Sequence, residues 1–300
     1  MRADAGRLWL SGPVVSILAL GLFLALPGQW SGAEIQAQSW SDFQASRAFQ
    51  GQEELSVRVS YEAGQFTLGP ASGNRLYQVR LRYDEEATSP IHDFGEGRLQ
   101  VGVDRTTSPR RVTSPFSRRG NGEDRLELQL GRQVPISLDL ELGAVRTEME
   151  LGGIPLTALN LATGASDSFL QVSESNPLEM DRVALQVGAA AFRAEGLGRL
   201  NARSIEVDAG VGDVRLDLTG LIQERSRIEV SMGLGSVRIA VPRDVGIRLT
   251  RSTFLTSVNA SGLSQRDGAY FSENWESADR TVEIQVDAAF GSITIERTDP

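Results

Sequence analysis

The segment IEVDAGVGDVRL, residues 205–216, alternates apolar and polar side chains on both sides of Gly210. Alternation with a period of two residues is typical of a β-strand that buries one face. A glycine between two such strands suits a corner, where a Cβ atom would clash or where φ is positive. The segment therefore predicts a strand, a bend at Gly210 and a second strand.

The same pattern returns along the second half of the chain. Five glycines stand at equivalent places: Gly143, Gly164, Gly188, Gly210 and Gly233. Aliphatic residues precede each glycine by five and three positions, as Ile205 and Val207 precede Gly210. Two more units fit if Ser252 and Ala289 take the place of the glycine. A period of about 22 residues indicates a stack of near-identical units.

Such a stack places like residues of successive units about 4.8 Å apart, so that columns of Leu, Ile and Val share one interior. The sequence thus predicts an all-β protein, a β-solenoid resembling a parallel β-helix with rungs of about 22 residues. An antiparallel sandwich is the structural alternative, but its strands do not preserve one residue type per column. Residues 34–50 are expected to cover the first rung, with a helix around Phe43 to Phe49.

The N-terminus has the features of an export signal. Arg2 and Arg7 precede the uncharged apolar run from Val14 to Leu26, which is too short to span a bilayer. An uncleaved anchor is the alternative to a cleaved leader. We divide the chain into a signal peptide (1–33), an N-terminal β domain or first rungs (34–104), an exposed Arg/Ser/Pro loop (105–124) and solenoid repeats (125–300).

Composition narrows the class of protein further. The formal net charge is −9, so we expect no general affinity for nucleic acid. The chain has no cysteine, which excludes disulfides and a lipid-modified N-terminal cysteine. We expect an exported protein of the periplasm, the cell envelope or the extracellular space, whose stability depends on burial of apolar side chains.

Few residues are candidates for catalysis. His92 is the single histidine, so histidine-based zinc sites and Ser-His triads have almost nothing to draw on, and we expect a structural or neutral role for it. Asp208, Asp213 and Asp217 could form the carboxylate pair of a polysaccharide-cleaving enzyme. We favour a solvated ladder of carboxylates and expect a protein without catalytic residues, metal or cofactor.

A column of arginines is the candidate ligand-binding site. Arg193, Arg215 and Arg238 each follow the unit's glycine by five residues. Stacking would bring the three guanidinium groups about 4.8 Å apart, with Glu195 and Asp217 two residues further along. The column is either a self-balancing ion ladder or a groove for an anionic envelope polymer or a lipid head group.

The segment from Ser261 to Arg280 interrupts the last units and contains Tyr270, Phe271 and Trp275. These aromatic side chains could form a platform on which a sugar ring stacks. We favour a hairpin that folds back over apolar surface, because aromatic side chains pack more often than they bind.

The chain resembles the toast-rack family, which is related to the extracytoplasmic part of LiaF-type cell-wall-stress proteins and to adhesin-type bacterial β-solenoids. The resemblance rests on four segments: Leu138–Gly153, Ile205–Leu218, Ile228–Pro242 and Val282–Ile295. The resemblance implies a β-solenoid and supplies no catalytic residues. We expect a module of the cell envelope that acts without catalysis in binding, sensing or scaffolding, with an anionic envelope polymer, lipid head groups or an envelope protein as its partner. A carbohydrate-active enzyme and an adhesin that assembles through its rung edges are the alternatives.

Overall fold

The structure, a computed structural model, describes residues 39–105 and 124–299 and is all-β, as the sequence predicts. Within these residues the only helix is one short 3-10 turn, and none is long and apolar enough to cross a membrane. The predicted signal peptide and almost all of the predicted loop at 105–124 lie outside the described residues. The division of the chain at 104 and 125 stays a prediction.

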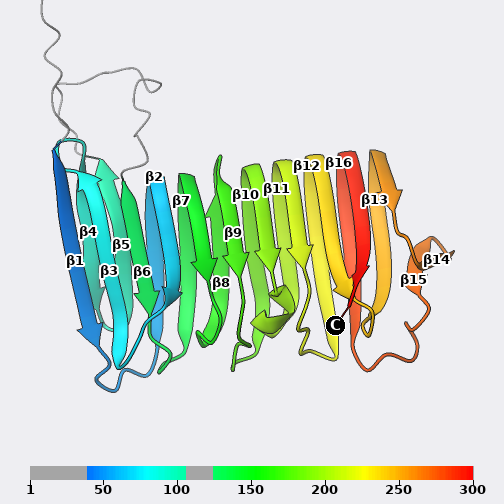
Figure 1. Ribbon diagram of the computed structural model, residues 1–300, viewed down its shortest axis with the longest axis horizontal. Helices are drawn as coiled ribbons and strands as arrows, with labels where there is room; N and C mark the ends of the chain where they lie inside the picture. The colour runs from blue at the N-terminus through cyan, green and yellow to red at the C-terminus, as the bar shows by residue number, and fades with distance from the viewer. Residues whose placement is uncertain (1–38, 106–123, 300) are drawn as a thin grey trace, which may run out of the picture. The chain divides into compact units, whose positions relative to one another are not determined.

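The strands follow one another closely along the chain (Figure 1). The first group is β1 (Trp40–Ala48), β2 (Leu55–Pro70), β3 (Arg75–Asp84), β4 (Thr88–Gly95), β5 (Arg98–Arg105) and β6 (Arg125–Leu130). The second group is β7 (Ile136–Glu150), β8 (Leu156–Thr163), β9 (Asp167–Gln171), β10 (Met180–Glu195), β11 (Ala202–Asp217), β12 (Arg225–Pro242), β13 (Gly246–Asn259), β14 (Leu263–Arg266), β15 (Ala269–Ser272) and β16 (Thr281–Thr298). The 3-10 turn η1 (Leu197–Leu200) connects β10 to β11.

The long strands lie parallel and in register, with like residue beside like residue. In the β11–β12 pair, Ile205 lies opposite Ile228 and Val207 opposite Val230. The strand β10 pairs with β11 in the same way, and β12 with β16. The columns predicted from the sequence are therefore present in the structure.

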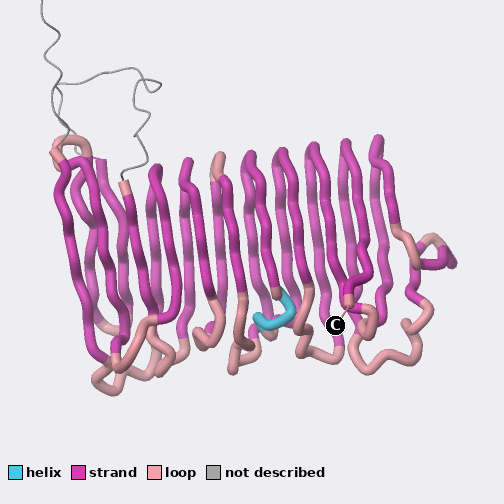
Figure 2. The backbone as a smooth tube through the Cα atoms, viewed as in Figure 1, coloured by secondary structure: helices cyan, strands magenta, loops and turns pink. Residues whose placement is uncertain are grey.

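Each long strand bends, so that its two halves belong to two facing layers. The strand β7 shows this, because residues Ile136–Leu142 pair with β8 whereas Thr147–Glu150 pair with β9. We call the half before the bend the first arm, the half after it the second arm, and the two arms together an arch. Figure 2 shows the long strands folding back along one edge of the stack.

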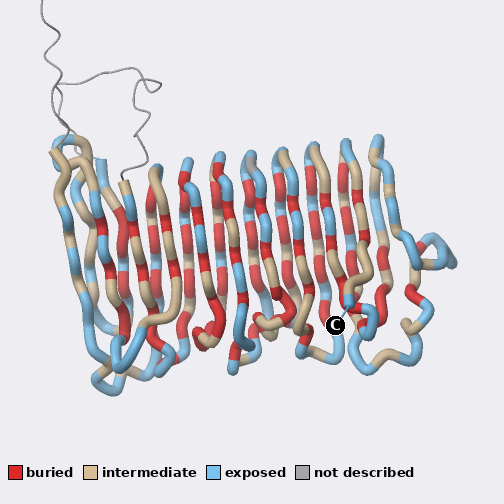
Figure 3. Tube along the Cα trace, viewed as in Figure 1, coloured by how far each residue is buried: buried red, intermediate tan, exposed pale blue. Residues whose placement is uncertain are grey.

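The space between the layers is the hydrophobic core. In β11, Ile205 and Val207 of the first arm and Val214 and Leu216 of the second arm all point inward and are at most 2% exposed. Buried positions alternate with exposed ones along the long strands, except in β13, which has no buried residue from Thr250 to Asn259 (Figure 3). Full burial of one such aliphatic side chain contributes about 1.5–3 kcal/mol, which gives a chain without disulfides its main source of stability.

The bend uses two columns of glycine for two different reasons. At Gly210 an added Cβ would lie 2.5 Å from the carbonyl oxygen of Gly188 in the next arch, and φ is not positive there. The second column lies two residues after the corner position: Gly235, two residues after Gly233, has φ 145°, and its Cβ would lie 1.8 Å from the carbonyl oxygen of Gly212. The predicted corner glycine is thus required by close packing, whereas the positive φ belongs to the second column.

The order of the last strands departs from the order of the sequence. Strand β16 lies between β12 and β13, so that β13 ends the series of long parallel strands (Figure 1). The predicted equivalence of Ala289 with Gly233 is confirmed by the register of β12 and β16. The predicted place of Ser252 is wrong, because Ser252 lies opposite Asp287 and Phe254 falls beside Ala289.

The predicted helix around Phe43 to Phe49 is also wrong. Residues Trp40–Ala48 form β1, which pairs antiparallel with β3 and places Phe43 opposite Leu81. The period-two alternation of this segment suits a strand, and β3 satisfies its backbone groups, which outweighs the local helical preference. The N-terminal end of the stack is therefore covered by strands.

The edge opposite the bend is held together by a buried asparagine, Asn176, which is 3% exposed. Its Nδ2 donates to the carbonyl oxygens of Leu156 at 2.8 Å and Leu200 at 3.1 Å. Its Oδ1 accepts from the backbone N–H groups of Leu156 at 3.1 Å and Leu178 at 3.2 Å. One side chain thus joins the return segments of three successive arches.

Candidate functional site

The three predicted arginines lie side by side on the outer surface of the second arms. Arg193 of β10 is opposite Arg215 of β11, which is in turn opposite Arg238 of β12. All three side chains are exposed. Because strands in a sheet lie about 4.8 Å apart, this register brings the cations together as predicted.

The arginines at the two ends of this column have carboxylate partners. Arg193 Nε donates to Glu195 Oε1 at 2.9 Å, and its guanidinium lies 6.0 Å from the centre of the Phe169 ring. Arg238 Nη1 lies 3.4 Å from Glu296 Oε1. These ion pairs are largely exposed to solvent, so each adds little to stability.

Arg215 in the middle of the column has no ion pair with any described residue. Two carboxylates lie two residues from Arg215 along its own strand, and both bond elsewhere. Asp213 accepts from the Ser236 hydroxyl, and Asp217 accepts from the hydroxyl of Thr219 at 2.6 Å and from its backbone N–H at 2.9 Å. The column is thus a balanced ion ladder at its ends, with a free cation between them.

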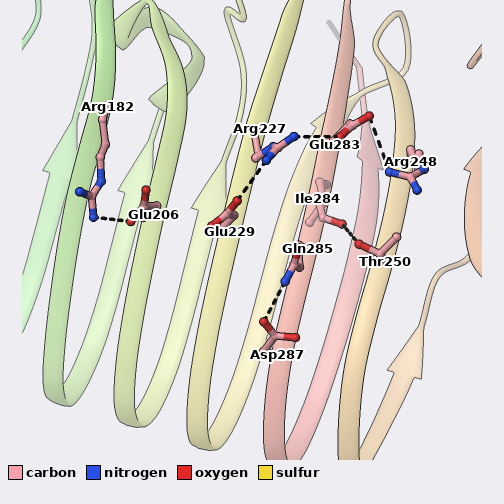
Figure 4. A network of polar contacts seen from close by, with 10 residues as sticks. All are labelled: Arg182, Glu206, Arg227, Glu229, Arg248, Thr250, Glu283, Ile284, Gln285 and Asp287. Carbon is pink, nitrogen blue, oxygen red and sulfur yellow. Dashed lines mark hydrogen bonds and ion pairs between the residues drawn. The ribbon is translucent and has the colours of Figure 1, made fainter.

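On the outer surface of the first arms, a network of paired cations crosses the last strands (Figure 4). Arg227 lies 3.7 Å from both Glu229 and Glu283, and Glu283 lies 3.6 Å from Arg248. This network crosses from β12 over β16 to β13 and leaves Arg227 no free charge for a ligand. Arg227 and Arg215 are therefore matched cations on the two faces of the stack, the first with an ion pair and the second without.

The three carboxylates of the enzyme alternative do not come together. Asp208 lies on the first arm of β11, whereas Asp213 and Asp217 lie on its second arm, on the opposite outer surface. Asp213 accepts a hydrogen bond from the Ser236 hydroxyl. In the part of the chain that the structure describes, no three His, Asp or Glu side chains form a cluster that could hold a metal ion.

His92 of β4 lies in an aromatic cluster at the N-terminal end of the stack. Its Nε2 is 3.1 Å from the Tyr77 hydroxyl, and its ring centre is 5.4 Å from that of Phe43. Burial raises the pKa of Tyr77. The contacts of His92 are those of a packing residue.

The aromatic segment after β13 forms the hairpin that we favoured. Strands β14 and β15 pair antiparallel, and β15 pairs with β13 at Arg248 and Leu249. The guanidinium of Arg266 lies 4.8 Å from the centre of the Phe271 ring, and that of Arg251 lies 5.7 Å from the Tyr270 ring. Arginine side chains thus already occupy positions over these two rings.

One surface feature was not predicted, an apolar ridge along the bend. It consists of Val211 and Leu234 at 51% exposure each, Phe290 at 44%, Leu255 at 65% and Phe254 at 76%. Four of the five follow the corner position by one residue and lie opposite one another in register, and the Phe254 and Phe290 rings meet edge to face at 5.9 Å. The sequence contains a signal for this ridge. The residue after each corner glycine is alanine in the first three units and a larger apolar residue, Val211 or Leu234, in the next two.

A shallow groove of ≈ 690 Å³ runs beside this ridge. Asp208, Asp287 and Phe254 are among its lining residues, and its other lining residues are mostly small. The groove lies across β11, β12, β16 and β13 at the bend, so it belongs to the end of the stack where β13 stands.

Comparison with protein families gives two adjoining matches. Residues 34–193 match the family model of the N-terminal domain of toast_rack, DUF2154, which is more than half of the chain. Residues 197–295 match the model described as cell wall-active antibiotics response LiaF, C-terminal. The boundary between the matches falls between β10 and β11, which pair in register, so the two matched segments share one sheet. A search of the curated proteins found no match.

The solved structures that match this chain come from several bacteria. A "putative cell adhesion protein" from Clostridium sporogenes is 15% identical with a TM-score of 0.46, over 87% of this chain and 100% of that one. A "putative lipid binding protein" from Parabacteroides distasonis is 8% identical with a TM-score of 0.46, over 85% and 96%. A "putative adhesin" from Bacteroides fragilis is 12% identical with a TM-score of 0.38, over 86% and 98%. At these identities and TM-scores the similarity carries no argument about function.

Proposed function

The chain belongs to the toast-rack family, and we propose from this premise that it is an exported, non-catalytic module of the cell envelope that binds an anionic envelope ligand. We infer that its arches are the rungs of a β-solenoid of about 22-residue units. The match of residues 197–295 to a LiaF C-terminal domain supports the location at the envelope. The separation of Asp208 from Asp213 and Asp217 supports a role without catalysis.

The observation that carries the ligand proposal is the free cation at the centre of the arginine column. Arg215 lies between Arg193 and Arg238 and forms no ion pair with a described residue. Its neighbours Arg193 and Arg238 are paired with Glu195 and Glu296, so the unpaired charge of the column is that of Arg215, and an anion beside it would supply a counter-charge. Guanidinium groups also suit phosphate and carboxylate oxygens by their planar, two-pronged geometry.

The ligand chemistry is therefore a phosphate or carboxylate group that is presented repeatedly, as on an anionic envelope polymer. A lipid head group offers the same chemistry on a membrane surface. An extended polymer fits the arrangement better, because the three arginines form a straight row across adjacent strands. The two sources are separated by testing a soluble polymer and a vesicle side by side.

We expect Arg215→Gln to weaken binding of a poly(glycerol phosphate) chain about tenfold, the loss of one charge-assisted contact. Isothermal titration at low and at physiological salt measures this, and the affinity should fall as salt is added. The matched control is Arg227→Gln, which removes the same charge from the opposite face, where Arg227 is already paired with Glu229 and Glu283.

Equal binding by wild type and Arg215→Gln would contradict the proposed site, as would an equal loss in Arg227→Gln. Binding to vesicles that contain an anionic phospholipid, without binding to the soluble polymer, would assign the column to lipid head groups instead. No binding to either probe would contradict the proposed ligand class.

A further inference from the structure

The outer edge of β13 is an open strand edge. On its inner side, β13 pairs with β16 from Gly246 to Asn259. On its outer side, its only strand partner among the described residues is β15, at Arg248 and Leu249. The remaining stretch, Ser252–Asn259, has no strand beside it in the part of the chain that the structure describes. We call this stretch the open edge.

The open edge lacks the devices by which natural proteins block edge pairing. Its sequence, STFLTSVN, contains no charge and no proline, whereas exposed edges are usually protected by charged residues, prolines or bulges. The hydroxyls of Thr256 and Ser257 donate inward, to the carbonyl oxygens of Ala288 at 3.2 Å and Gly291 at 3.5 Å, and do not cover the outer side. The edge is therefore free to accept another strand.

The most exposed apolar side chains of the described residues lie on this same edge. Phe254 is 76% exposed and Leu255 is 65% exposed, more than any other large hydrophobic side chain in those residues. Apolar side chains so exposed mark an interaction surface, since contact with a partner would remove them from water. Backbone pairing and apolar burial therefore point to the same place.

The strands at the other end of the stack are protected. Strand β1 carries Asp42 and Arg47, and the Arg47 guanidinium lies 4.5 Å from the centre of the Phe94 ring of β4. Strand β4 carries Pro90 and Asp93. Charges and proline disfavour an added strand, so a head-to-tail contact between β13 of one copy and β1 or β4 of the next is disfavoured.

We propose that the partner of the open edge is the open edge of a second copy of this chain, paired antiparallel about a two-fold axis. Such a contact uses the same surface on both copies, so the assembly stops at a dimer. No charges oppose each other along Ser252–Asn259, although the chain as a whole carries a net charge of −9 and copies repel elsewhere. This inference is independent of the anionic ligand, because it involves the edge of the stack and not the arginine column.

Sedimentation of the full chain, of 32.5 kDa, from about 1 to 100 µM tests the proposal. We expect the mass to rise with concentration and to level off at twice the monomer mass. We expect Leu255→Lys to weaken the dimer about 100-fold, because it brings like charges to the contact. The matched control is Val211→Lys, at the same place in an inner arch of the apolar ridge, which should leave the dimer intact.

Both substituted side chains are more than half exposed, so both variants should melt at the wild-type temperature. A wild-type protein that stays monomeric throughout would overturn the proposal and leave the edge to a strand of another protein. Equal loss in Val211→Lys would move the contact to the ridge, away from the edge. Growth beyond two copies would show a head-to-tail assembly and contradict the two-fold contact.

Discussion

Gly235→Ala is expected to destabilise the fold by about 4 kcal/mol, near the upper end of what single substitutions do. The new Cβ would lie 1.8 Å from the carbonyl oxygen of Gly212, a backbone atom that cannot move without breaking the register of β11 and β12. The φ of 145° adds strain, since side chains other than glycine rarely adopt it. The same clash recurs at Gly291, whose Cβ would lie 1.7 Å from the carbonyl oxygen of Gly235.

Chemical unfolding with urea measures this loss, and two other glycines serve as controls. Gly69→Ala, in a strand with no atom within 4 Å of the new Cβ, should change the free energy of unfolding by less than about 1 kcal/mol. Gly262→Ala has a positive φ of 79° but its nearest atom is 3.9 Å away, so it should cost about 1–2 kcal/mol from strain alone. If Gly235→Ala cost no more than Gly262→Ala, the close stacking of the bends would be contradicted.

Asn176→Ala is expected to destabilise the fold by about 3 kcal/mol, because it removes four hydrogen bonds between a buried amide and the backbone of three return segments. The amide of Asn176 bonds to Leu156, Leu178 and Leu200 at 2.8–3.2 Å. The carbonyl oxygens of Leu156 and Leu200 lose buried hydrogen bonds, whereas the N–H of Leu156 keeps its bond to the carbonyl oxygen of Ile154 at 2.9 Å. The loss should appear as a lower midpoint of thermal unfolding.

The control for this prediction is Asn74→Ala. Asn74 is exposed, and its side chain makes one long hydrogen bond, to the carbonyl oxygen of Phe49 at 3.4 Å. We expect a change within about 0.5 kcal/mol, as for most surface substitutions. Similar costs for Asn176→Ala and Asn74→Ala would mean that the return segments hold together without the buried amide.

The sequence predicted the arches where its pattern was strong. Alternation on both sides of Gly210 was enough to identify the inward columns, because only one face of each arm can be buried. The unit around Ser252 was misplaced because it ends the row of long strands. In β13, Arg251 lies opposite Val286, which is buried in β16. The alternation of apolar and polar residues that would set the register is therefore absent at this place.

The order of the last strands could not be predicted from local pattern. The segment between β13 and β16 is long enough for β16 to pair with β12. The alternation of apolar and polar residues in β13 and β16 does not indicate which of the two strands pairs with β12. The helix expected around Phe43 to Phe49 failed for a related reason, since the partner of β1 is β3, distant in sequence. Tertiary pairing decided both cases.

The candidate site was predictable in position but not in charge state. Spacing from the glycines placed the three arginines in one column, and the register confirms that placement, while their role as a binding site stays a prediction. The spacing did not predict which of the arginines form ion pairs. Arg193 pairs with Glu195 on its own strand, whereas Arg238 pairs with Glu296 on the neighbouring strand. The apolar ridge could have been found from the residue after each glycine.

The central claim is that successive arches lie parallel and in register, and engineered cysteines test it most directly in a chain that has none of its own. Arg215→Cys with Arg238→Cys places two thiols on directly opposite residues of adjacent strands, about 4.8 Å apart between Cα atoms and within disulfide range. Arg193→Cys with Arg238→Cys separates them by two strands, about 9.6 Å, which is beyond that range. We predict that mild oxidation closes a disulfide within one chain in the first pair and none in the second, and an outcome without a disulfide in the first pair, or with equal disulfides in both, would contradict the stack.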